Sequence, residues 1–165
     1  MEISYLADVP ELAGQLIPGL LEHWRPIVPE DTAEARVQRF RAHMNREALP
    51  IAWLAHEGGQ ALGTAALRAS DLPGRQDLSP WLAGVYVAPP FRGRGIASAL
   101  CRVVEERAAA LGYQRLYLFT LDQQRLYQRL GWTPLERAVW RGRTADVMSK
   151  TLPATIADRA STGPS

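Results

Sequence analysis

The chain has 165 residues, 47% of them hydrophobic, which suits one domain with an ordinary buried core and excludes a disordered protein. Its 19 basic and 17 acidic residues leave a net charge of +2, too small an excess for the clustered positive surface that nucleic-acid binding needs. The single cysteine, Cys101, excludes an internal disulfide and a cysteine-rich zinc site.

Other features narrow the class of protein further. No stretch approaches the roughly 18 consecutive apolar residues of a membrane span, and the N-terminus carries Glu2 instead of the basic residues of a secretory signal. Three scattered histidines show no metal-ligand spacing, so no metal is expected. We therefore expect a cytoplasmic protein that binds neither nucleic acid nor membranes, with one domain over residues 1–152 and a disordered tail over residues 153–165.

The first third of the chain predicts a strand followed by two helices. Residues 2–7 alternate weakly between apolar and polar side chains, as a strand does. Asp8 is placed to cap the next helix, which Pro18-Gly19 should disturb. Thr32 is predicted to cap the second helix.

The middle of the chain predicts a hairpin and then a buried strand. Residues 51–56 form an apolar run, Gly58-Gly59 a tight turn, and residues 60–69 the partner strand. A polar loop over residues 70–80 leads to residues 81–87, whose β-branched and aromatic side chains predict a buried strand.

The rest of the chain alternates helices and strands. In order, it predicts a helix over residues 96–111 that Gly112 ends, a strand over 115–120, a helix over 122–130, and two antiparallel strands over 132–140 and 144–150. The strand over residues 115–120 should run parallel to that over residues 81–87, because a helix connects the two. The element order is therefore β-α-α-β-β-β-α-β-α-β-β.

A glycine-rich loop lies between the strand over residues 81–87 and the helix after it. Ala88-Pro89-Pro90 ends the strand, and Arg92-Gly93-Arg94-Gly95 precedes the helix. The first amides of a helix have no intrahelical acceptor and carry partial positive charge, and glycines let an anion come close to the backbone. The loop therefore predicts a phosphate or pyrophosphate site.

Three anion-binding loops share this order of strand, loop and helix. A P-loop requires Lys-Ser/Thr after its last glycine, where this chain has Ile96-Ala97. A dinucleotide-binding loop requires a third small residue, which this chain offers only as a serine. The third pattern, R/Q-x-x-G-x-G/A, is matched by Arg92, Gly95 and Ala97. With V-Y-V-A-P-P-F before it and L-Y-Q-R-L-G-W after it, this pattern resembles the GCN5-related N-acetyltransferase (GNAT) superfamily over residues 51–152.

The resemblance implies an α/β fold with a GNAT-type mixed, splayed β-sheet of six to seven strands, flanked by about four helices and split between its fourth and fifth strands. It implies an enzyme that transfers the acetyl group of acetyl-CoA to a primary amine of a small molecule or peptide, by direct attack in a ternary complex. Transfer of another acyl group and a non-catalytic acyl-CoA-binding sensor are the alternatives. Dimers are common in the superfamily, and residues 139–148 offer an edge for a homodimer.

The same resemblance assigns the donor site and a general acid. The backbone of Val85, Tyr86 and Val87 would hold the pantetheine arm, and an amide there would polarise the thioester carbonyl. The pyrophosphate would lie on the loop and first helical turn, which comprise Arg92, Gly93, Arg94, Gly95, Ile96, Ala97 and Ser98. Tyr127 matches the tyrosine that faces the CoA sulfur. With an ordinary pKa near 10 it is protonated at neutral pH and can donate to the leaving thiolate.

The group that accepts the amine proton is not visible in the sequence. Family members often place a carboxylate on the central strand, and residues 81–87 carry none. Asp71, Asp77, His23 or an ordered water are left as the base. Cys101 is distant in sequence from every histidine and is expected to be a buried structural thiol.

The acceptor side has candidates from two residue types. At most one or two of four tryptophans should line the pocket, because large aromatic residues are more often part of the core: Trp24, Trp81, Trp132 and Trp140. Three arginines are candidates to bind an acidic group of the acceptor: Arg25, Arg68 and Arg141. The class of amine stays open, because the residues around a site, and not the fold, decide the substrate.

Overall fold

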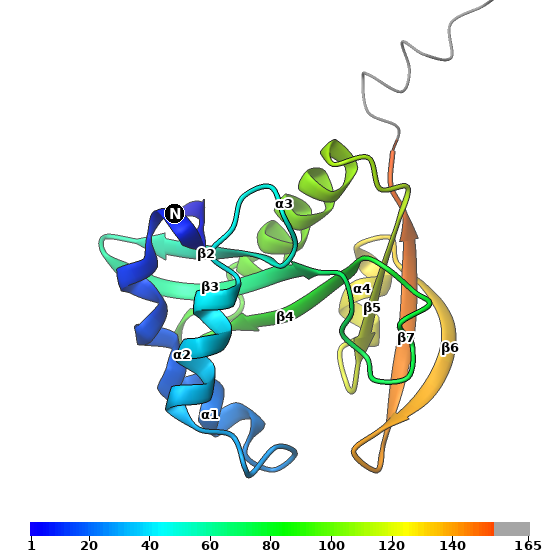
Figure 1. Ribbon diagram of the computed structural model, residues 1–165, viewed down its shortest axis with the longest axis horizontal. Helices are drawn as coiled ribbons and strands as arrows, with labels where there is room; N and C mark the ends of the chain where they lie inside the picture. Colours follow the sequence, from blue (N-terminus) through cyan, green and yellow to red (C-terminus); the bar gives the residue numbers. More distant parts are fainter. Residues whose placement is uncertain (154–165) are drawn as a thin grey trace, which may run out of the picture.

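The structure is a computed structural model that describes residues 1–153; the tail expected over residues 153–165 lies, apart from Pro153, outside the described residues. Seven strands form one mixed sheet in the order β1-β2-β3-β4-β5-β7-β6 (Figure 1). Their bounds are Glu2–Tyr5, Ile51–Glu57, Gln60–Arg68, Trp81–Val87, Arg115–Thr120, Thr133–Trp140 and Arg143–Thr151 for β1 to β7. The α-helices are Ile17–Trp24, Ala33–Ala42, Ile96–Ala110 and Gln124–Arg129 for α1 to α4. The expected order of elements and the expected sheet are confirmed.

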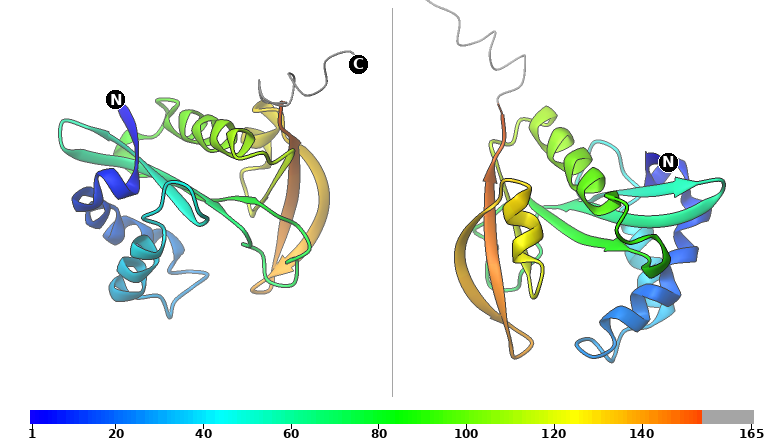
Figure 2. Two further views of the ribbon diagram at one scale, coloured as in Figure 1. Left: turned by 45° about the horizontal axis from the view of Figure 1, so that its top comes forward. Right: turned by 180° about the vertical axis from the view of Figure 1, so that it is seen from behind.

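The sheet is split where β4 and β5 meet. These two parallel strands share one paired position, Trp81 opposite Tyr117, and the amide of Tyr117 donates to the carbonyl of Pro80 at 3.0 Å. Beyond that point the strands diverge towards their C-terminal ends (Figure 2). Every other neighbouring pair in the sheet is antiparallel and paired over several residues. The split therefore opens the middle of the sheet between two well-paired halves, as the resemblance implied.

The helices cover opposite faces of the first half of the sheet. The left view in Figure 2 shows α3 on one face of this half and α1 and α2 on the other. On the α3 face, Leu100, Cys101 and Val104 pack fully buried in the largest apolar core, which Tyr127 of α4 also joins. On the other face, Leu20 of α1 is buried in a second core that Phe40 of α2 borders. The sheet therefore separates one pair of helices from the other.

The N-terminal segment differs from the expectation in three ways. The first strand ends at Tyr5, and Asp8 caps no helix but forms an ion pair with Arg46. Residues 10–16 form a 3₁₀-helix, and the α-helix begins at Ile17. Pro18 lies in the first turn of α1, where its missing N–H costs nothing, so it starts the helix where we expected it to disturb one.

Thr32 caps α2 as predicted. Its backbone is extended and its Oγ1 accepts a hydrogen bond from the amide of Ala35 at 3.1 Å. We expect Thr32→Ala to lower the free energy of unfolding by about 1 kcal/mol, the usual cost of losing such a cap. Urea denaturation measures this, with Thr32→Ser as the control that keeps the hydroxyl. Equal stability of the two variants would contradict the role of the cap.

Candidate active site

The loop between β4 and α3 leaves open space in front of a helix N-terminus. A short 3₁₀ turn, Pro89–Phe91, leads into it. Gly93 and Gly95 have φ angles of +80° and +76°, a left-handed conformation that favours glycine. A Cβ added at either position would have no atom within 4 Å, and no side chain caps the first amides of α3. The loop therefore fits a phosphate group, which these amides would hold.

The two arginines of this loop have different surroundings. Arg92 donates from Nε to the carbonyl of Val87 at 3.0 Å, and its guanidinium lies over the ring of Tyr86 at 6.0 Å. Arg94 forms an ion pair with Glu57 at 3.1 Å. Arg92 is thus fixed to the end of β4 and forms no ion pair with a carboxylate of residues 1–153, whereas Glu57 offsets part of the charge of Arg94.

A bulge interrupts β4 beside the split. Ala83 lies opposite Ala66 and Tyr86 opposite Thr64, so Gly84 and Val85 together face a single residue of β3. Gly84 takes a φ of +60° at this point. A bulge leaves main-chain groups out of the ladder, and here they lie next to the gap between β4 and β5.

Tyr127 is a buried phenol on α4. It is 7% exposed and packs edge-on against Trp132, with ring centroids 6.3 Å apart. Burial raises the pKa of Tyr127, and the neighbouring Cys101 and Asp122 add to the rise, so the hydroxyl stays protonated at neutral pH. Burial also raises the pKa of Cys101 to about 12, which makes its thiol a poor nucleophile.

The three candidate bases lie in different surroundings. Asp77 is paired with Arg75 on an exposed loop, and Asp71 accepts a hydrogen bond from Arg68 at 2.9 Å. His23 of α1 lies edge-on to Tyr86 of β4, with ring centroids 5.6 Å apart. Burial and the cation of Arg92 lower the pKa of His23, so its imidazole is neutral at pH 7. His23 therefore places a neutral imidazole beside β4.

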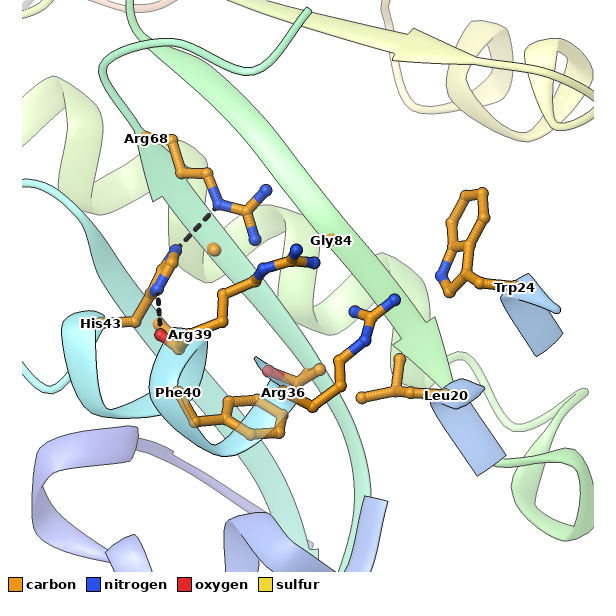
Figure 3. A pocket seen from close by; sticks show the side chains of 11 residues that line it. Leu20, Trp24, Arg36, Arg39, Phe40, His43, Arg68 and Gly84 are labelled. Carbon is orange, nitrogen blue, oxygen red and sulfur yellow. Dashed lines mark hydrogen bonds between the residues drawn. The ribbon is translucent and has the colours of Figure 1, made fainter. Parts of the chain in front are cut away.

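A pocket opens on the face of the sheet that α1 and α2 cover (Figure 3). Its floor includes Gly84, so it reaches the bulge of β4. The charged lining consists of Arg36 and Arg39 of α2 and Arg68 of β3, whose guanidinium groups all point towards β4 in Figure 3. Trp24 of α1 adds an aromatic wall. The pocket thus reaches the bulge of β4, and the loop follows the C-terminal end of the same strand.

The sequence anticipated part of this pocket. Of the acceptor candidates, Trp24 and Arg68 line it. Trp81 and Trp132 are buried in the core, and Arg141 forms an ion pair with Glu30 at 2.5 Å. Sequence reasoning missed three lining residues of α2 and its C-terminal end, namely Arg36, Arg39 and His43. Their spacing of three and four residues places them on one helix face, and this was the available signal.

The fold resembles those of solved acetyltransferases. An aminoglycoside 6′-N-acetyltransferase complexed with coenzyme A has a TM-score of 0.73 and 20% identity, and the match covers 94% of this chain and 99% of that one. For the aminoglycoside 6′-N-acetyltransferase from Enterococcus faecium the TM-score is 0.72 and the identity 21%, with the same coverage of 94% and 99%. YncA, a putative acetyltransferase from Salmonella typhimurium with its cofactor acetyl-CoA, has a TM-score of 0.67 and 17% identity, and the match covers 94% of this chain and 95% of that one.

Curated relatives match a shorter segment. N-acetyltransferase family 8 member 2 of Rattus norvegicus is 40% identical over 86 residues, and N-acetyltransferase 8 of Mus musculus is 42% identical over 86 residues. Each match covers 48% of this chain and 37% of the relative's length. Within residues 1–153, no helix is long and apolar enough to cross a membrane.

The family comparison covers most of the chain. Residues 17–132 match the acetyltransferase (GNAT) family, a span that begins with α1 and ends after α4. It includes β4, the loop, α3 and Tyr127, the segments on which the resemblance rested. The chain therefore belongs to the acetyltransferase (GNAT) family.

Proposed function

We propose that this protein transfers the acetyl group of acetyl-CoA to a primary amine, by direct attack in a ternary complex. The observation that carries the proposal is that two candidate sites share the strand β4. The open N-terminus of α3 follows that strand on one side, and the pocket that contains Gly84 opens on the other. Two substrates held in this way would bring their reacting atoms together without a covalent enzyme intermediate.

The donor side fits acetyl-CoA. Residues 92–98 would hold the pyrophosphate with main-chain amides, supported by the charge of Arg92. The main-chain groups of Val85, Tyr86 and Val87, beside the divergence of β4 and β5, would bind the pantetheine arm. Acetyl-CoA supplies the thioester. Two of the three solved neighbours described above contain coenzyme A or acetyl-CoA, which supports this choice of donor.

Two side chains would move the protons of the reaction. The amine nitrogen forms a bond to the acetyl carbon while the carbon–sulfur bond breaks, so the nitrogen must lose a proton and the sulfur must gain one. We assign donation to the sulfur to Tyr127, whose raised pKa keeps it protonated. We assign acceptance of the amine proton to His23, which is neutral at pH 7. Each such group typically contributes about 10²–10⁴-fold to the rate.

Release of free CoA thiol from acetyl-CoA, measured across a panel of amines, tests the proposal. The panel holds aminoglycosides, amino acids, polyamines, arylalkylamines and peptides with free N-termini. We expect release that depends on one amine class, and a higher melting temperature with acetyl-CoA because the ligand binds the folded state. A thermal shift with no release for any amine would favour the sensor alternative. The absence of both CoA release and a thermal shift would contradict the assignment of residues 92–98.

A further inference from the structure

We propose that the acceptor is an amine that carries a carboxylate close to the reacting nitrogen, as an amino acid does, and that Arg39 and Arg68 bind this carboxylate. The inference rests on the proposed function, because it names the substrate class of the same site. It follows from the position of Arg68, from the charges around the pocket, and from the apolar wall opposite them.

Arg68 is held over the bulge. Its Nε donates to Nε2 of His43 at 2.8 Å and its Nη1 donates to Asp71 at 2.9 Å. Its Nη2 lies 3.4 Å from the point where a Cβ on Gly84 would stand, and within residues 1–153 it has no acceptor. A guanidinium fixed in this way presents a free N–H beside the place where the amine would react.

His43 positions Arg68 without adding charge. Its Nδ1 donates to the carbonyl of Arg39 at 2.6 Å, so its Nε2 is free to accept from Arg68 (Figure 3). Burial, together with the cation of Arg68, lowers the pKa of His43 to about 4. The imidazole is therefore neutral at pH 7 and serves as a hydrogen-bond acceptor.

The pocket has more cations than anions. Arg36 pairs with Asp31 at 2.6 Å, and Arg68 pairs with Asp71. Arg39 has no ion-pair partner in the described part of the chain, and no carboxylate lines the pocket. Burial lowers the pKa of Arg36, and the charges of Arg39 and Arg68 lower it further, as expected where guanidinium groups crowd together. One positive charge is left for a ligand.

The single uncompensated positive charge of the pocket favours one chemical class of acceptor. A carboxylate carries a single negative charge and matches the planar fork of an arginine with two parallel hydrogen bonds. A phosphate would bring nearly two charges to one uncompensated cation. An aminoglycoside, with several ammonium groups, would be repelled by the one uncompensated guanidinium group. The pocket therefore fits a carboxylate on the amine.

The opposite wall is apolar and aromatic. Trp24 lines the pocket and packs edge-on against Trp140 of β6, with ring centroids 5.9 Å apart. Leu20 of α1 lines the pocket on the same side as Trp24, and Phe40 of α2 adds apolar lining on the side of the arginines. The remainder of the acceptor would thus meet apolar surface, so aromatic amino acids are suitable probes. Phenylalanine and phenethylamine, and tryptophan and tryptamine, are two pairs that differ only in the carboxylate.

Rates with these pairs test the inference. We expect kcat/KM for the amino acid to exceed that for its decarboxylated partner by about 10- to 100-fold, the range for a hydrogen bond to a charged group. Arg39→Gln should bring this ratio close to one and leave the KM for acetyl-CoA unchanged. Arg41→Gln, an exposed arginine of the same helix, is the control and should keep the ratio. Equal rates within both pairs in the wild-type protein would overturn the inference.

A binding experiment separates this inference from the proposed function. Calorimetry in the presence of CoA compares N-acetylphenylalanine with N-acetylphenethylamine, the products of the first pair. Tighter binding of the acid, lost in Arg39→Gln and kept in Arg41→Gln, supports the carboxylate site even if no amine is acetylated. Equal binding of the two overturns it even if acetylation is fast. Acetylation of any amine therefore tests the proposed function. The difference in affinity between the acid and its decarboxylated partner tests the carboxylate site.

Discussion

Replacing Gly95 with aspartate is expected to weaken acetyl-CoA binding by at least about 100-fold. The residue precedes the first turn of α3 at a φ of +76°, and the space in front of it is open. An aspartate would place a negative charge where the pyrophosphate is expected. Two like charges about 4 Å apart at an effective dielectric constant of about 20 repel each other by about 4 kcal/mol, and each 1.4 kcal/mol is a factor of ten in affinity. Calorimetric titration with acetyl-CoA measures the loss.

Gly142→Asp is the matched control for this variant. Gly142 has a φ of +75°, and a Cβ added to it would also meet no atom within 4 Å, but it lies in the turn between β6 and β7. The two substitutions therefore share the backbone strain and differ in distance from the loop. We expect the control to bind acetyl-CoA as the wild-type protein does. Undiminished binding by Gly95→Asp would exclude residues 92–98 as the pyrophosphate site.

Replacing Tyr127 with phenylalanine is expected to lower kcat by about 10²–10⁴-fold, the usual contribution of a positioned general acid. The change removes one hydroxyl and keeps the ring that packs against Trp132, so the fold and the affinity for acetyl-CoA should be nearly unchanged. Because burial raises the pKa of Tyr127, loss of its proton should not limit the wild-type rate at mildly alkaline pH. Steady-state rates with the best amine of the panel, and titration with acetyl-CoA, measure the two effects.

Tyr5→Phe provides the comparison for Tyr127→Phe. Tyr5 is half-buried in β1 and packs on Trp53, with ring centroids 5.5 Å apart, so its variant loses a tyrosine hydroxyl outside the site. Its kcat should stay at the wild-type value. If Tyr127→Phe turned over as fast as Tyr5→Phe, Tyr127 would not be the acid. A loss of acetyl-CoA affinity equal to the loss of rate would indicate a role in binding instead.

The variants address opposite sides of the same strand. Gly95 lies at the start of α3, after the C-terminal end of β4, and Arg39 lies on α2, on the face that carries the acceptor pocket. A donor-site variant should therefore change the affinity for acetyl-CoA with every amine. An acceptor-site variant should change the ratio between amines with acetyl-CoA affinity intact. The separation of these effects follows from the sheet that stands between the helices.

Local patterns predicted most of the fold. The strands over residues 81–87 and 115–120 have the predicted bounds, because their apolar runs end at a proline segment and at polar residues. The parallel pairing of these strands and the cap at Thr32 also follow from short-range rules. The Asp8 cap was wrong, because Arg46, 38 positions away in sequence, pairs with its carboxylate. A sequence pattern does not contain such a partner.

The sequence by itself determined the order of elements and the positions of the glycine-rich loop before α3 and of the tyrosine of L-Y-Q-R-L-G-W, since each depends on neighbours within a few residues. Only the tertiary structure decided the pocket that we propose for the acceptor. Arginines on a helix are most often solvated, and the spacing of Arg36 and Arg39 fits a solvated helix face as well as a pocket wall. The packing of α2 over β3 and β4 places them beside Arg68 and Gly84, and it takes Arg36 partly out of water. Contacts between distant segments, together with burial, therefore determine which of these arginines can bind a ligand.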